Sequence, residues 1–229
     1  MKYHPLQLGI HRQDWSGESK PRLFTTQPEV EKAKIFERDN HTCQFCGFKS
    51  EKYQEIHHKN GDDKDFADNN CLTACIFCHQ CFDLKSVATM SSGVLIWLPE
   101  IGQAALHHIM RALYIARFAQ GPLSTASKSI LEILKNRRLE AKKRLGSDNP
   151  SDLAVVLEDF LNDKQYKRVQ SKLKGVRLMP LDRRIVQDGT LEFNKFPQIL
   201  AYWRLKGGPF TDISPEKWGA MFKELDKAS

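Results

Sequence analysis

The stretch Cys43-Gln44-Phe45-Cys46 is followed, after 28 intervening residues, by a second CxxC pair, Cys75-Ile76-Phe77-Cys78. Each CxxC pair supplies two sulfur ligands from one tight turn, and zinc in structural sites takes four tetrahedral thiolate or imidazole ligands. Two such pairs therefore predict a closed structural zinc site made by Cys43, Cys46, Cys75 and Cys78. The competing interpretation is two coincidental cysteine pairs in a reduced core.

All six cysteines of the chain lie between positions 43 and 81. A disulfide framework would be spread so as to cross-link a whole domain, so this crowding favours a reducing compartment and a bound metal. We expect Cys71 and Cys81 to be buried core residues, with an alternate ligand role as the second option for Cys81. Zinc binding contributes on the order of 10 kcal/mol to small zinc modules, so residues 40–85 are predicted to lose their structure without it.

A second set of polar residues is interleaved with the cysteines: His57, His58, Asn70, His79 and Asp83. Metal-assisted phosphodiester cleavage needs a cation at the phosphate and a base held in one orientation. His79 and Asp83 are four residues apart on a predicted helix, a spacing that suits two ligands of one ion. Asn70 could orient the base through its amide. Neighbours on a strand point to opposite faces, so His57 and His58 would share a site only across a bend.

The bulk composition describes a folded chain of 229 residues with 41% hydrophobic and 28% charged residues. The apolar run 93–99 is too short to span a bilayer, and residues 1–9 lack a long apolar signal core. We therefore expect a cytoplasmic protein with no membrane segment and no secretion signal. The formal net charge of +7 admits nucleic acid or an acidic protein surface as a partner. The basic stretches 128–144 and 164–184 fit a solvated helix face equally well.

The predicted fold class is α+β: a small zinc-stapled core followed by a mainly helical region. We predict an N-terminal arm (1–28), a zinc-binding domain (29–92), a strand plus helical domain (93–185) and a C-terminal appendage (186–229). The expected helices cover residues 28–39, 78–88, 104–120, 124–145 and 153–161, the last capped by Ser151 and Asp152, and the expected strands cover 53–58, 71–75 and 93–99. In helix 124–145 the inward residues are predicted to be Ile130, Leu131, Leu134 and Leu139.

Four segments together resemble the HNH nuclease pattern, which has a ββα-metal core: residues 38–47 (RDNHTCQFCG), 55–58 (EIHH), Asn70, and 75–79 (CIFCH). The resemblance implies that His58 is the general base and Asn70 its orienting partner. It also implies that His57, His79 and Asp83 bind a second, catalytic divalent metal, which could be Mg, Mn or Zn. Asp83 stands where the nuclease colicins have a histidine.

A longer resemblance, over roughly residues 30–185, is to the DotN (IcmJ) family of the Dot/Icm type IVB secretion system. It is carried by residues 43–48 (CQFCGF), 53–55 (YQE), 73–82 (TACIFCHQCF), 93–100 (GVLIWLPE) and 137–146 (RRLEAKKRLG). It implies an HNH-like zinc fold reused as a protein-binding subunit of the coupling complex. The implied partner is the C-terminal tail of a DotL-like coupling ATPase, which would recruit the chain to the inner membrane.

This chain departs from that family in two respects. The best-known members lack histidines at positions 57, 58 and 79, and residues 186–229 have no counterpart that we can place. The alternative function is therefore an active divalent-metal-dependent HNH endonuclease that cleaves DNA, with the basic helices on the phosphate backbone. A third interpretation is a DNA-binding zinc module without catalysis.

Overall fold

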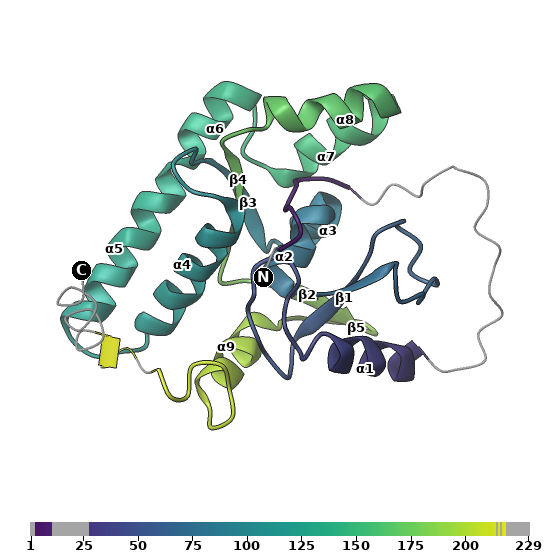
Figure 1. Ribbon diagram of the computed structural model, residues 1–229. Helices are drawn as coiled ribbons and strands as arrows, with labels where there is room; N and C mark the ends of the chain where they lie inside the picture. The colour runs from purple at the N-terminus through teal and green to yellow at the C-terminus, as the bar shows by residue number, and fades with distance from the viewer. Residues whose placement is uncertain (1–2, 11–27, 214, 216, 219–229) are drawn as a thin grey trace, which may run out of the picture. The chain divides into compact units, whose positions relative to one another are not determined.

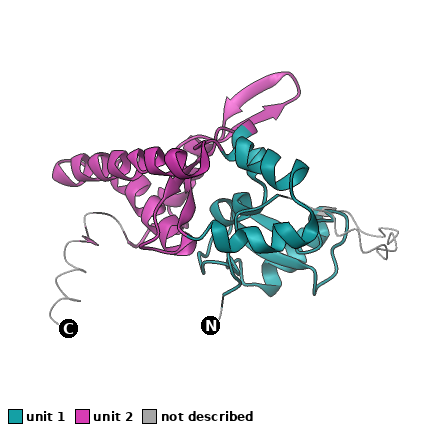
Figure 2. Cartoon of the chain, turned by 90° about the horizontal axis from the view of Figure 1, so that it is seen from above, with its two compact units in different colours: residues 1–88, 150–174 teal, residues 89–149, 175–229 magenta. Residues whose placement is uncertain are grey.

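Helices and small antiparallel sheets make up the computed structural model, which describes residues 3–10, 28–213, 215, 217 and 218 (Figure 1). The predicted α+β class is confirmed. The chain divides into unit 1, residues 1–88 with 150–174, and unit 2, residues 89–149 with 175–229 (Figure 2). The predicted domain boundaries at 92 and 185 do not coincide with these limits. Most of the predicted N-terminal arm and the last eleven residues of the predicted appendage lie outside the described residues.

Unit 1 is built around the antiparallel pair β1 (Gln54–His58) and β2 (Cys71–Cys75), in which Gln54 lies opposite Cys75 and His58 opposite Cys71. Ile35 of α1 packs against Ile56 and Cys71, which joins this helix to the sheet. The other elements are α1 (Pro28–Arg38), α2 (Ile76–His79), the 3₁₀ turn η1 (Gln80–Phe82), α3 (Leu84–Thr89, which ends at the first residue of unit 2), α7 (Pro150–Asp159) and α8 (Asp163–Lys172).

The helix predicted over residues 78–88 is wrong, because the chain forms two short helices and a 3₁₀ turn there. Asp83 leaves the helical conformation, with φ −140° and ψ 76°. Its carboxylate accepts hydrogen bonds from the backbone N (3.1 Å) and the hydroxyl of Ser86 and so caps α3. The argument that His79 and Asp83 lie one helical turn apart therefore fails.

Unit 2 contains the antiparallel pair β3 (Gly93–Trp97) and β4 (Val176–Pro180), with Gly93 opposite Pro180 and Trp97 opposite Val176. Gln103 ties a helix to this sheet, because its amide nitrogen donates to the Leu178 carbonyl (2.7 Å) and its oxygen accepts from the Leu178 nitrogen (3.0 Å). The other elements are α4 (Gln103–Ala116), α5 (Pro122–Asn136), α6 (Arg138–Leu145), β5 (Ile185–Asp188), β6 (Leu191–Asn194) and α9 (Phe196–Arg204).

The predicted helix 124–145 is divided into α5 and α6, which meet at Arg137. Leu131 is buried as predicted, but Ile130 is 42% exposed and Leu139 is 64% exposed. The α5 side that carries Leu131 packs within unit 2, so Ile130, one residue earlier, lies off the packed side. Helix α7 starts at Pro150, a residue suited to the first helical turn, so the predicted cap at positions 151 and 152 is wrong.

Helix α9, inside the predicted appendage, is part of the core of unit 2. Phe196 and Trp203 are buried, and the Phe196 ring lies 5.2 Å from that of Tyr114 on α4. The guanidinium of Arg111, also on α4, lies 6.0 Å from the Trp203 ring. Among the described residues, no helix is both long enough and apolar enough to cross a membrane.

Candidate metal centre

The Sγ atoms of Cys43, Cys46, Cys75 and Cys78 all lie within 4.8 Å of one another, and all four side chains are buried. The Cys46 and Cys75 sulfurs are 3.8 Å apart. Zinc binds thiolate sulfur at about 2.3 Å in a tetrahedron, whose edges are then about 3.8 Å long. The four cysteines could therefore hold a zinc ion with little movement.

The first cysteine pair sits in a tight turn closed by backbone hydrogen bonds. The Cys43 nitrogen donates to the Phe48 carbonyl (2.9 Å), and the Gly47 nitrogen donates to the Cys43 carbonyl (2.8 Å). Gly47 has φ +76°, which disfavours any residue with a Cβ, and a Cβ there would also collide with the Tyr3 hydroxyl. The Gln44 nitrogen donates to the carbonyl of Thr73 (2.8 Å). This last bond fixes the turn against β2, the strand that leads to the second pair.

The second pair sits where a strand turns into a helix. Cys75 is the last residue of β2 and precedes α2 in extended conformation, with φ −73° and ψ 157°, and Cys78 lies within α2. Burial raises the pKa of the Cys78 thiol well above its ordinary value, and hydrogen bonds with the three other cysteines raise it further. Thiolates at this place therefore need a cation beside them, which zinc would supply. The donor set fits zinc.

The two remaining cysteines lie outside this cluster, and their predicted burial is confirmed. The Cys71 thiol donates to the Asp65 carbonyl (3.2 Å), and the Cys81 thiol donates to the Phe77 carbonyl (3.5 Å). Burial raises the pKa of Cys71 to about 12 and raises that of Cys81 as well. Both are protonated core thiols at neutral pH.

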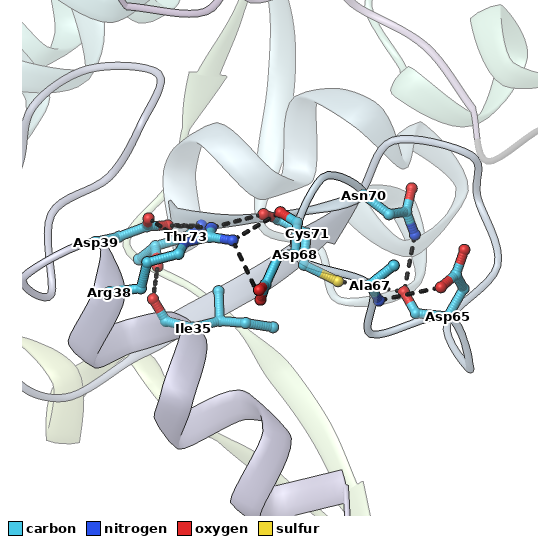
Figure 3. A network of polar contacts seen from close by, with 9 residues as sticks. All are labelled: Ile35, Arg38, Asp39, Asp65, Ala67, Asp68, Asn70, Cys71 and Thr73. Atoms are coloured by element: carbon cyan, nitrogen blue, oxygen red, sulfur yellow. Dashed lines mark hydrogen bonds and ion pairs between the residues drawn. The ribbon is translucent and has the colours of Figure 1, made fainter. Parts of the chain in front are cut away.

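A polar network holds the end of α1 against β2 (Figure 3). Arg38 donates to the carbonyls of Cys71 and Asp68, each at 2.7 Å. Asp39 accepts from Arg38 Nε (2.8 Å) and from the Thr73 nitrogen (2.9 Å). Both residues belong to the HNH-like segment 38–47, but that pattern does not predict this structural role. The available signal was a carboxylate placed directly after a helix that ends in arginine.

No known family model matches the chain. A curated protein of Legionella pneumophila subsp. pneumophila, named Type 4 apparatus protein DotN, is 33% identical over 153 residues, which cover 64% of this chain and 70% of that protein. The chain belongs to the DotN family. This result confirms the longer of the two resemblances seen in the sequence.

In this member of the DotN family, the two adjacent histidines of β1 point to different surroundings. The His57 ring lies 4.1 Å from the Phe82 ring. The His58 ring meets Phe66 edge-on at 5.1 Å. Burial lowers the pKa of His58, and its buried Nε2 has no hydrogen-bond partner among the described residues. The structure thus shows the divergence that strand geometry predicts.

The other residues of the predicted catalytic set are also engaged in local contacts. His79 Nδ1 lies 3.7 Å from a carboxylate oxygen of Glu55, and its ring is 6.3 Å from that of His57. Among the described residues, the four cysteines are the one group of three or more His, Cys, Asp or Glu side chains gathered at metal-binding distances. His57, His79 and Asp83 do not form such a group.

The amide of Asn70 holds its own loop together rather than His58. Its nitrogen donates to the Asp65 carbonyl (2.8 Å) and to Asn60 Oδ1 (3.0 Å), and its oxygen accepts from the Asn60 nitrogen (3.0 Å). Both of its donor hydrogens are used in these bonds. Figure 3 shows the Asn70 side chain turned toward Asp65. The amide therefore shapes the loop between β1 and β2.

Proposed function

We propose that this chain is a zinc-stabilised subunit of a type IV secretion apparatus, working by protein contacts within the complex around its coupling ATPase. The observation that carries this proposal is that the chain is 33% identical to a protein named Type 4 apparatus protein DotN, over 70% of the length of that protein. The four-cysteine cluster supports a frame rigid enough to present a docking surface. The proposed partner is the C-terminal tail of a DotL-like coupling ATPase, which would recruit the chain to the inner membrane.

We further propose that the zinc core is an HNH-like ββα unit. The support is the order of elements, since the antiparallel strands β1 and β2 are followed directly by α2. Helix α2 has only four residues, so it is shorter than the full helix of a ββα unit.

The contacts of the polar residues support a protein-binding role better than they support DNA cleavage. The rings of His57 and His58 diverge, the Asn70 amide is bonded within its loop, and the Asp83 carboxylate caps α3. A nuclease needs a base, its orienting group and a metal directed at one phosphate. In this account the HNH-like unit is retained as a scaffold.

The test is complex formation between the full-length chain and the purified C-terminal tail of a DotL-like coupling ATPase, followed by size exclusion and light scattering. We expect a stoichiometric complex with the wild type and with His58→Ala, and loss of the complex with Cys75→Ser. Cys71→Ser, a change of a buried cysteine in the same strand, is the matched control and should still bind. A folded, zinc-loaded chain that forms no complex would refute the proposal.

A second assay addresses the nuclease alternative with the same proteins. Supercoiled plasmid is incubated with the wild type and with Mg, Mn or Zn in turn. We expect no cleavage. Cleavage by the wild type that disappears in His58→Ala would establish the endonuclease in place of the scaffold.

A further inference from the structure

The outer face of α8 carries a row of cations. Lys164, Lys167, Arg168 and Lys172 are spaced at three, one and four residues, which puts them on one side of the helix, and all four are exposed. Lys174 follows just after the helix and is exposed too. None of these side chains has an acidic partner among the residues that the structure describes. The face therefore carries four exposed cations, and Asp163 in the first turn is the one carboxylate of α8.

The opposite side of α8 is fixed to the rest of unit 1. The Tyr166 hydroxyl accepts a hydrogen bond from the Ile10 nitrogen (3.3 Å), and the Gln170 amide donates to the Leu8 carbonyl (2.9 Å). A capping box between Asn162 and Gln165 sets the first turn. These contacts fix which side of α8 faces the segment 8–10, and the cations lie on the other side of the helix.

Helix α7 passes into α8 at a corner (Figure 1), and two residues next to this corner have exposed apolar side chains. Phe160 is 72% exposed and Val156 is 45% exposed. Glu158, between them, pairs with Lys85. Residues 160–174, which follow α7, contain five cations and one carboxylate, so this stretch is strongly positive, whereas the last two residues of α7, Glu158 and Asp159, are acidic.

We propose that the α7–α8 corner binds the surface of an anionic lipid bilayer. Lysine and arginine side chains are attracted to anionic headgroups, and an exposed aromatic side chain enters the interface between headgroups and acyl chains. A nucleic acid would use the same cations but gives no reason for two exposed apolar residues beside them. This contact is independent of the proposed ATPase partner, and it would add a direct attachment to the recruitment through that partner.

The experiment is cosedimentation of the full-length, zinc-loaded protein with vesicles of phosphatidylglycerol and phosphatidylethanolamine, against vesicles of phosphatidylcholine alone. We expect binding to the anionic vesicles that weakens as salt rises, and none to the neutral ones. Each neutralised cation should lower the partition coefficient of the protein onto anionic vesicles about fivefold, so the double variant Lys167→Gln/Arg168→Gln should lower this coefficient about 25-fold. Phe160→Ser should lower binding to anionic vesicles while leaving the fold intact.

The matched control is Lys142→Gln/Lys143→Gln, which removes two exposed cations from α6 and should leave vesicle binding unchanged. Equal losses in the two double variants would overturn the proposal, because net charge alone would then explain the binding. Absence of binding to anionic vesicles at low salt would overturn it as well. So would binding of a duplex DNA fragment that is lost in Lys167→Gln/Arg168→Gln while vesicles are not bound, since the surface would then be a nucleic-acid site.

Discussion

Replacing Cys75 by serine removes one of the four sulfurs that come within 4.8 Å of one another. A structural zinc site contributes on the order of 10 kcal/mol to the folding of small modules, whereas a whole domain is stable by only about 5–15 kcal/mol. If the remaining three ligands cannot hold the ion, unit 1 loses most of its net stability. We therefore expect Cys75→Ser to unfold this unit at room temperature.

Cys71→Ser is the matched control, because Cys71 is equally buried in the same strand but lies outside the cluster. A serine there can still donate to the Asp65 carbonyl, so we expect a cost of about 1–2 kcal/mol and full retention of zinc. The assay combines the metal content per chain with urea unfolding followed by circular dichroism. The reasoning is refuted if Cys75→Ser keeps one zinc per chain and the wild-type midpoint, or if both variants lose zinc alike.

Three further changes probe the surroundings of the metal centre. Asp39→Asn weakens the charge-assisted hydrogen bonds that Asp39 accepts from Arg38 and from the Thr73 nitrogen of β2. We therefore expect the free energy of unfolding, measured by urea titration, to fall by about 1–3 kcal/mol. An unchanged free energy of unfolding would contradict the role of this polar network. Gly47→Ala forces a Cβ into a left-handed conformation at a cost of about 1–2 kcal/mol, and the loss of melting temperature should be smaller in a Tyr3→Ala background, where the collision is absent. Burial lowers the pKa of His58 below its ordinary 6.5, so as the pH falls the unfolded chain takes up this proton before the folded chain does, and the free energy of unfolding decreases. We expect His58→Gln to make the free energy of unfolding depend less on pH between pH 7.5 and 5.5. An unchanged pH dependence would show that His58 is not its source.

The sequence predicts the clustering of the four cysteines well because the spacing of two CxxC pairs is a local chemical signature. The strands at 54–58 and 71–75 and the burial of Cys71 follow from equally local patterns. The break at Asp83 could not be predicted from helical spacing, since it depends on a carboxylate that caps the next helix instead of continuing the first. The contacts of Asn70 depend in the same way on the path of its loop.

Long-range pairing limits what the sequence predicts in unit 2. Strand β3 finds its partner β4 about 80 residues further along the chain, after the segment 150–174 has contributed to unit 1. No local pattern identifies such a partner. The hairpin β5–β6 did carry a local signal, because the two residues between its strands are Gly189 and Thr190, and a glycine with φ +60° suits the first position of a two-residue hairpin turn.

X-ray absorption at the zinc edge of the purified protein tests the central claim most directly. We predict one zinc per chain with four sulfur neighbours at about 2.3 Å and no nitrogen or oxygen in the first shell. A protein without zinc, or a spectrum that requires nitrogen or oxygen ligands, would contradict the account.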